Sequence, residues 1–220
     1  MTAMNHPDAS AAAPGDVTDV QARPLGAARD TRSDGGSRAV ELESIAGGDG
    51  PPPAGAVRPT AAFMRGHPAH WIALAFGAGL SPAAAGTVGT LWAWLVWALL
   101  LAPLAPAAQG AVIALTLLAG WWAATVTARH LQSADPGAIV VDEVIAFWIV
   151  LWLVTPAGIW TQLVALALFR FFDAVKPGPV GCADRLLHGA HGWRGGFGIL
   201  LDDLVAAFCT LLVMALWRAW

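Results

Sequence analysis

Residues 110–128, GAVIALTLLAGWWAATVTA, form an uninterrupted apolar run that contains no charged side chain. An α-helix rises about 1.5 Å per residue, so this run is close to the ~20 residues that cross a ~30 Å hydrocarbon core. Residues 88–105, VGTLWAWLVWALLLAPLA, form a second uncharged run of similar length. The two runs predict an all-α, multi-pass integral membrane domain.

Two further apolar segments extend this prediction. Residues 144–172 are apolar up to Arg170 but are interrupted by Thr155, Pro156 and Gly158, which indicates two shorter helices joined by a turn. Residues 204–217 predict a last helix that begins there or one turn earlier. The composition agrees, because 57% of residues are hydrophobic, the mean hydropathy is +0.60, and 12 Trp occur with no Tyr.

The first 66 residues have a different composition. They are rich in Ala, Gly, Pro and Ser, include the stretch GGDGPPP at 47–53, and hold eight of the 15 acidic residues. Few large apolar side chains are present to offset the entropy of ordering, so 1–66 is predicted to be a disordered N-terminal tail. The absence of a basic start followed by an apolar segment argues against a secretory signal. The membrane-embedded domain is predicted to cover 67–220.

The charges that remain lie between the apolar runs and not within them. Only seven acidic residues follow position 66, and the connections around 103–109 and 155–161 carry no charge. A charge inside the bilayer costs several kcal/mol, so alternate crossings would gather the charged connections on one side. Lys and Arg favour the cytoplasmic side. The net charge of −3 gives no basic surface for nucleic acid, and two cysteines are too few for a zinc cluster or a disulfide framework.

Two acidic pairs are each predicted to open an apolar helix, Asp142-Glu143 and Asp202-Asp203. Carboxylates at such positions often serve only as favourable helix ends. Two pairs in a charge-poor membrane domain instead favour a magnesium site, because Mg²⁺ takes oxygen ligands and is completed by substrate phosphate. All four residues are therefore candidate metal ligands and catalytic residues, and the nearby Asp173 is a further ligand or a base.

Basic side chains accompany these acids in the pattern Arg-x-x-Asp-x-x-Lys-Pro. Arg170 and Asp173 share one face if this segment is helical, and Pro177 then stops the helix. Arg170 and Lys176 are candidate phosphate-binding residues, because charge-assisted hydrogen bonds stabilise phosphoryl oxygens. A structural ion pair between Arg170 and Asp173 is the simpler alternative.

Residues 77–90, GAGLSPAAAGTVGT, precede the first apolar run. The glycines free the backbone to curl, and the helix that follows offers N–H groups to an anion. Ser81, Thr87 and Thr90 are candidate hydroxyl donors to substrate. An ordinary turn with a helix cap is the alternative interpretation.

Together these stretches resemble the phosphatidylglycerophosphatase A family. The matching motifs are GAGLSPAAAGTVGT at 77–90, DPGAIVVDE at 135–143, RFFDAVKP at 170–177 and GFGILLDD at 196–203, in the family's order. The resemblance covers roughly 68–217. It implies an enzyme of the bacterial inner membrane, with its active site facing the cytoplasm, that uses Mg²⁺ to convert phosphatidylglycerophosphate to phosphatidylglycerol. The family usually has Pro where this chain has Ala85, and the 190–194 stretch resembles an insertion.

The resulting hypothesis is attack on phosphorus by a metal-activated water, although the residues leave a carboxylate nucleophile open. The principal alternative is an ion-coupled transporter that uses the clustered carboxylates. A transporter predicts acids at the bilayer midplane and an internal repeat, and no convincing repeat is found. A non-catalytic membrane scaffold is a third possibility. A lipid synthase would need an Asp-Gly-x-x-Ala-Arg type stretch, which is not found.

Overall fold

The computed structural model describes residues 59–220. Most of the predicted tail, 1–66, therefore lies outside the described residues. The last tail residues include a short helix, α2 (Ala61–Arg65), whose start is capped by Thr60: the Thr60 side-chain oxygen accepts a hydrogen bond from the backbone N–H of Phe63 at 3.1 Å. Met64 of α2 is buried, so ordered structure begins before the predicted boundary at residue 67.

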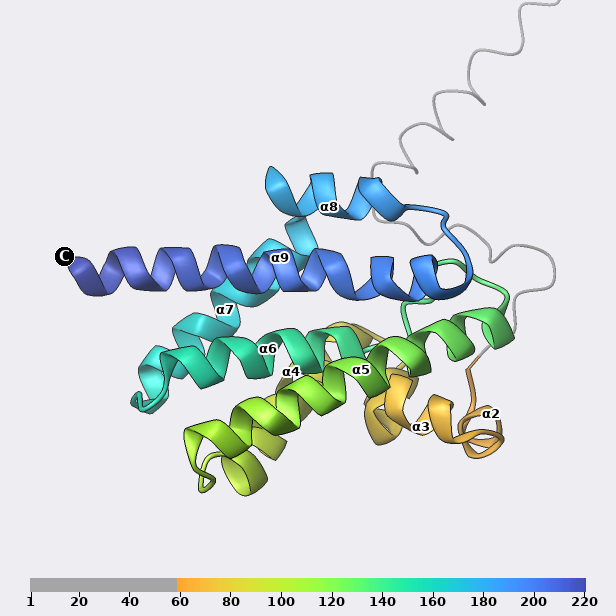
Figure 1. The fold of residues 1–220 in the computed structure, drawn as a ribbon, viewed down its shortest axis with the longest axis horizontal. Helices are drawn as coiled ribbons and strands as arrows, with labels where there is room; N and C mark the ends of the chain where they lie inside the picture. Colours follow the sequence, from red (N-terminus) through yellow and green to blue (C-terminus); the bar gives the residue numbers. More distant parts are fainter. Residues whose placement is uncertain (1–58) are drawn as a thin grey trace, which may run out of the picture. The chain divides into compact units, whose positions relative to one another are not determined.

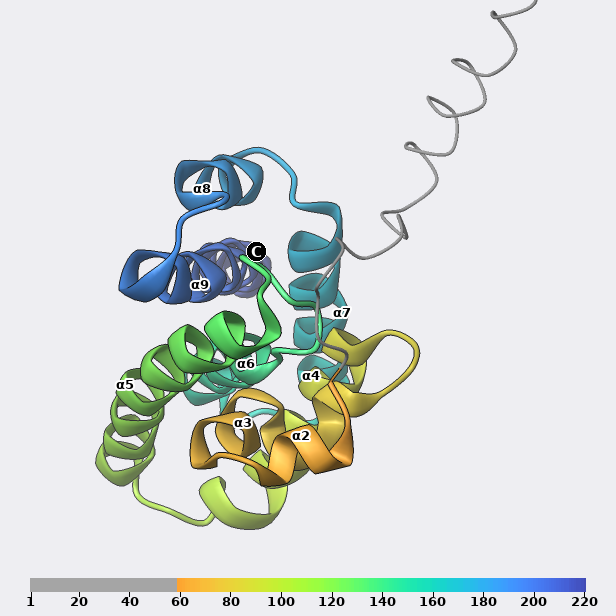
Figure 2. The same cartoon turned by 90° about the vertical axis from the view of Figure 1, so that its right-hand side faces the viewer.

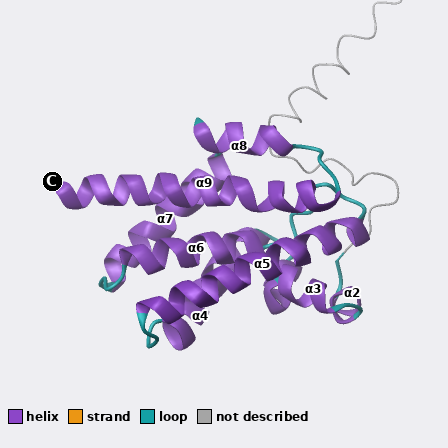
Figure 3. Cartoon of the chain, viewed as in Figure 1, coloured by secondary structure: helices purple, strands orange, loops and turns teal. Residues whose placement is uncertain are grey.

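Every regular element within 59–220 is a helix (Figure 3), as the sequence predicts. After α2 the elements are α3 (Pro68–Ala73), a 3₁₀ segment η1 (Ala75–Leu80), α4 (Ala85–Val96), a π-helical segment η2 (Trp97–Leu101), α5 (Pro106–Leu131), α6 (Val141–Val154), α7 (Ile159–Val175), α8 (Pro179–Leu187) and α9 (Gly192–Ala219).

Two of these helices, α5 with 26 residues and α9 with 28, are long and apolar enough to cross a membrane. Helix α4 and η2 form a shorter apolar stretch, Ala85–Leu101. The predicted interruption after residue 154 is also present, because α6 ends at Val154 and α7 begins at Ile159. At about 1.5 Å per residue, neither α6 nor α7 alone matches a ~30 Å hydrocarbon core.

The last helix begins much earlier than the sequence predicted. It starts at Gly192 and not near residue 204, so Asp202 and Asp203 lie inside α9 and do not open it. The glycines at its start permit close packing. A Cβ on Gly196 would lie 2.0 Å from Thr125 Oγ1 of α5, and one on Gly195 would lie 2.3 Å from a backbone carbonyl oxygen. Tertiary packing here outweighs the low helix propensity of glycine.

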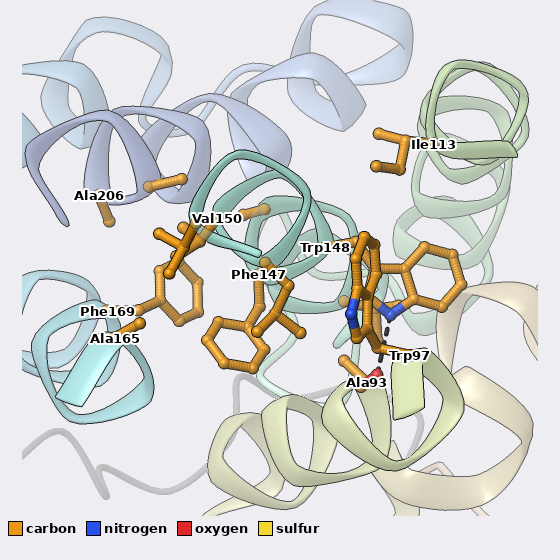
Figure 4. Packing of buried hydrophobic residues seen from close by; sticks show 14 of the residues in the cluster. Ala93, Trp97, Ile113, Phe147, Trp148, Val150, Ala165, Phe169 and Ala206 are labelled. Carbon is orange, nitrogen blue, oxygen red and sulfur yellow. Dashed lines mark hydrogen bonds between the residues drawn. The ribbon is translucent and has the colours of Figure 1, made fainter. Parts of the chain in front are cut away.

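The main core is built around α6, which packs against α9, α4, α5 and α7. Phe147 stacks on Phe169 of α7 with ring centroids 5.6 Å apart, and Trp148 Nε1 donates a hydrogen bond to the carbonyl of Ala93 in α4 at 2.9 Å (Figure 4). All four residues are buried. This hydrogen bond satisfies the indole N–H, which would otherwise cost free energy in an apolar core.

The helices have two distinct ends. The α6–α7 turn, the η2–α5 turn and the C terminus lie at the left in Figure 1, whereas α2, α3 and the start of α9 lie at the right. Figures 1 and 2 both place α9 between α8 and α6. The first turn of α6 carries Asp142 and Glu143, and it faces the end occupied by α2 and α3. The uncharged turns thus lie at the opposite end of the bundle from the start of α6, which fits the predicted gathering of charges.

Candidate active site

Three carboxylates converge where α6 packs against α9. Asp142 and Glu143 come from the first turn of α6, and Asp203 comes from α9. Each offers a carboxylate oxygen, and these oxygens all lie within 4.8 Å of one another. Asp203 is 3% exposed, and the Glu143 side chain is 12% exposed. Three carboxylates that repel one another and are largely buried from solvent need a positively charged partner.

The described residues do not supply a hydrogen-bond donor or positive charge to every one of these carboxylate oxygens. Asp142 Oδ1, Glu143 Oε2 and Asp203 Oδ1 are buried and have no hydrogen-bond partner within the described residues. Leaving a buried charged oxygen unsatisfied costs several kcal/mol. An all-oxygen donor set of anionic carboxylates is the environment that a hard divalent cation such as Mg²⁺ prefers. The residues present therefore fit a divalent metal centre.

Arg170 lies beside this acidic group, in the second half of α7. Its Nη1 is 3.7 Å from Glu143 Oε1, and it also donates a hydrogen bond to Asp173 one turn further along α7. The buried Arg170 Nε has no partner within the described part of the chain. Arg170 thus contacts both Glu143 and Asp173, and its Nε–H can donate to an additional acceptor.

The start of α4 meets the same two side chains. A Cβ on Gly86 would lie 2.1 Å from Glu143 Oε1 and 3.1 Å from both terminal nitrogens of Arg170. Ala84, the N-cap residue of α4, lies in the left-handed region with φ 49° and makes no side-chain cap for the helix. Uncapped N–H groups and the helix dipole favour an anion at such a terminus. The acidic group, Arg170 and the α4 N-terminus therefore surround one position.

The three hydroxyl residues predicted to contact substrate have different environments. Thr90 is fully buried, and its hydroxyl donates to the carbonyl of Gly86 at 2.8 Å. Ser81 donates to the carbonyl of Ala83 at 2.7 Å. These bonds give both hydroxyls a role in shaping the 77–90 segment. Thr87 lies in the first turn of α4, partly exposed, one residue after Gly86.

Asp202, the neighbour of Asp203 in the second acidic pair, contacts Lys176 and is not part of the three-carboxylate group. Asp202 Oδ2 accepts a hydrogen bond from Lys176 Nζ at 2.6 Å, and Asp184 of α8 accepts another from the same nitrogen at 2.6 Å. Successive residues of an α-helix point about 100° apart, so Asp202 and Asp203 face different neighbours. The structure thus separates Asp202 from the group formed by Asp142, Glu143 and Asp203.

Lys176 occupies a turn position suited to holding this contact. It follows α7 with φ 49° and ends the helix. Burial lowers the pKa of the Lys176 ammonium, but the hydrogen bonds that it donates to Asp184 and Asp202 outweigh burial and raise the pKa above its ordinary value. Lys176 therefore stays positively charged, and it joins α7, α8 and α9 next to the acidic group.

Comparison with known proteins identifies the family to which this chain belongs. The family model described as phosphatidylglycerophosphatase A matches residues 71–218. The chain belongs to the phosphatidylglycerophosphatase A family. It is therefore a phosphatase, and the ion-coupled transporter that the residues left open is not supported. The predicted resemblance is confirmed over nearly the same range.

Relatives of the phosphatidylglycerophosphatase A family cover most of the described domain. A phosphatidylglycerophosphatase A of Haemophilus influenzae is 34% identical over 154 residues, which is 70% of this chain and 91% of that protein. One from Escherichia coli is 37% identical over 141 residues, 64% of this chain and 77% of that protein. A Bacteroides thetaiotaomicron protein, provisionally named a phosphatidylinositol-3-phosphatase, is 36% identical over 157 residues, 67% of this chain and 91% of that protein. No solved structure matches the chain.

Two residues of the site were not singled out as functional from the sequence. Gly86 was quoted within the 77–90 motif, but only the structure shows its backbone against Glu143 and Arg170. Asp184 of α8 is the second of these residues, and in the structure it accepts a hydrogen bond from Lys176. A glycine in the first turn of a predicted helix was the available signal for close backbone approach.

Proposed function

We propose that this phosphatase hydrolyses phosphatidylglycerophosphate to phosphatidylglycerol and phosphate, and that it requires Mg²⁺. The observation that carries the proposal is the set of three buried carboxylate oxygens that have no hydrogen-bond partner within residues 59–220, placed beside Arg170 and the uncapped start of α4. A divalent cation would satisfy the carboxylate oxygens. A phosphate dianion would accept hydrogen bonds from Arg170 and from the start of α4.

Asp142, Glu143 and Asp203 are the proposed metal ligands. Bound Mg²⁺ would supply charge neutralisation at the phosphoryl oxygens and a water of lowered pKa. Asp202 was a further ligand candidate from the sequence. Its contact with Lys176 supports a different role for it, which is to hold Lys176 beside the phosphate position.

The chain's own residues position and stabilise the phosphoryl group. Arg170 donates N–H groups to phosphate oxygens, and Asp173 orients the guanidinium through its hydrogen bond. The N–H groups at the start of α4 provide a second set of donors. Charge builds on the equatorial oxygens in the transition state, so donors fixed in advance lower the barrier.

In the proposed reaction a water oxygen forms the new bond to phosphorus while the bond from phosphorus to the glycerol oxygen breaks. The departing oxygen takes a proton and remains as the free hydroxyl of phosphatidylglycerol. Asp173, which accepts a hydrogen bond from Arg170, is the candidate base that accepts the proton of the attacking water. Trapping of a phosphorylated aspartate would replace this water attack with a carboxylate nucleophile.

The proposed location is the bacterial inner membrane, with the site at the cytoplasmic surface. The apolar helices α5 and α9 support membrane insertion. Excess Lys and Arg mark cytoplasmic segments. Arg129 lies in the last turn of α5, Lys176 directly follows α7, and Arg185 lies in the short helix α8. The acyl chains of the substrate remain in the bilayer, which concentrates and orients the headgroup.

The test is phosphate release from phosphatidylglycerophosphate in detergent micelles. Wild type is compared with Asp142→Asn, each with Mg²⁺ and with a chelator. The expected result is release that requires both Mg²⁺ and Asp142, with both proteins eluting at the same position on size exclusion. Release by wild type in chelator overturns the metal requirement, and no release by well-folded wild type overturns the substrate.

A further inference from the structure

A cavity of about 260 Å³ lies next to the proposed metal site but is separate from it. It is enclosed by the segment before α6, by α8 and the turn after it, and by the first half of α9. The polar and small residues of its wall used below are Ser133, Ala134, Asp135, Asp184, His188 and Asp202.

The cavity and the metal site share one wall. Asp202 lines the cavity, whereas the next residue, Asp203, belongs to the acidic group. Lys176 binds Asp202 and Asp184, which are both cavity residues. Asp202 and Asp203 are consecutive in α9, with Cα atoms about 3.8 Å apart, so the cavity and the metal site adjoin at this turn.

The charges of the cavity disfavour a phosphate group inside it. Three carboxylates line it, and Lys176 is the cation that contacts two of them. A second phosphate would meet this excess of negative charge, whereas hydroxyl groups would not. A carboxylate accepts hydrogen bonds only, and His188 and Ser133 add groups that both donate and accept. The wall is therefore suited to an uncharged part of a ligand that carries hydroxyl groups.

We propose that this cavity is the subsite for the polyol portion of the lipid headgroup, the part that carries the scissile phosphate. The inference rests on the proposed lipid phosphatase function and adds the residues that select the alcohol. Asp135 is the clearest of these, because it lines the cavity and makes no ion pair or hydrogen bond within the described residues. The names of the relatives refer to glycerol and inositol headgroups, which are both polyols.

The test compares two lipid phosphates that differ in the polyol. Phosphatidylglycerophosphate carries its terminal phosphate on glycerol, whereas phosphatidic acid carries it directly on the diacylglycerol. Asp135→Asn replaces a charged acceptor with a neutral one, and Ala134→Leu fills part of the cavity. Ala108→Leu, an exposed position in the first turn of α5, is the matched control for the added bulk.

We expect Asp135→Asn and Ala134→Leu each to lower kcat/KM for phosphatidylglycerophosphate about tenfold, since a charged hydrogen bond is lost or blocked. Values for phosphatidic acid should stay within about twofold of wild type, and Ala108→Leu should match wild type on both lipids. If phosphatidic acid is bound but not hydrolysed, its inhibition constant replaces kcat/KM. Soluble glycerol 3-phosphate, tested as an inhibitor, separates recognition of the polyol from anchoring by the acyl chains.

Two results separate the subsite from the function on which it rests. Equal loss on both lipids, or no loss on either, overturns the polyol subsite while leaving the phosphatase intact. Absence of phosphate release from every lipid by folded wild type overturns the lipid phosphatase itself. A soluble glycerol 3-phosphate that inhibits wild type and the Asp135→Asn variant equally also contradicts the subsite.

Discussion

Adding a single methyl group at Gly86 tests the geometry of the site most directly. Gly86 lies in the first turn of α4, where its backbone approaches Glu143 and Arg170. In Gly86→Ala the new Cβ would lie 2.1 Å from Glu143 Oε1, about 1.3 Å short of the 3.4 Å at which ordinary contact begins. The Glu143 carboxylate must retreat, and the guanidinium of Arg170, at 3.1 Å, is also pressed.

The expected loss of activity is large and the expected loss of stability is small. Displacement of a catalytic group by about 1 Å costs about 100-fold in rate, which is roughly 2.7 kcal/mol of transition-state stabilisation. Overpacking costs about 1–3 kcal/mol of folding free energy, but alanine is favoured over glycine in a helix by about 1 kcal/mol. The atom that must move is the end of a side chain, so the net loss of stability stays below about 2 kcal/mol.

The assay is kcat/KM for phosphatidylglycerophosphate together with thermal unfolding in the same detergent. Gly137→Ala is the matched control, because a Cβ on Gly137 meets nothing within 4 Å and its φ lies outside the left-handed region. Gly137→Ala should keep wild-type activity. Full activity in Gly86→Ala would refute the placement of Glu143 against α4, and equal loss in both variants would point to a general effect of removing glycine.

Three further predictions concern the acids, the arginine and the packing of α9. Asp203→Asn should raise the Mg²⁺ concentration for half-maximal activity about tenfold or more, whereas Asp202→Asn should leave it within about threefold; Mg²⁺ titrations of activity distinguish them, and equal shifts would argue that both bind metal. Arg170→Lys should lower kcat/KM about 10- to 100-fold, because an ammonium cannot reproduce the guanidinium fork, and unchanged kinetics would remove Arg170 from phosphate binding. Gly196→Ala should destabilise the fold by about 1–3 kcal/mol in thermal unfolding, because its Cβ would lie 2.0 Å from Thr125 Oγ1; an unchanged melting temperature would contradict that packing.

The sequence predicted the helical class because that class depends on local patterns. Uncharged runs marked the apolar helices, and the Thr155-Pro156 interruption marked the turn between α6 and α7. Asp142 and Glu143 follow a short connection and open an apolar helix, as predicted. The structure places both acids beside Asp203, and it places Glu143 beside Arg170.

What the sequence did not predict depends on contacts between distant segments. The glycine-rich start of α9 has a poor local helix propensity, and it is helical because Gly195 and Gly196 allow close approach to other segments. The early start of α9 also changes the environment of Asp202 and Asp203. As adjacent acids they appear equivalent in the sequence, but the helix directs one to Lys176 and the other to the buried carboxylates.

This divergence of two neighbouring side chains has a thermodynamic consequence. Asp203 belongs to the proposed cation site and Asp202 to the proposed polyol cavity, and one rigid turn of α9 carries both. Any rotation of that turn changes both sites together. Linkage then requires reciprocity: if a bound cation increases the affinity for the alcohol by some factor, the alcohol increases the affinity for the cation by the same factor. The headgroup would in this way help to load the ion that is needed for its own hydrolysis.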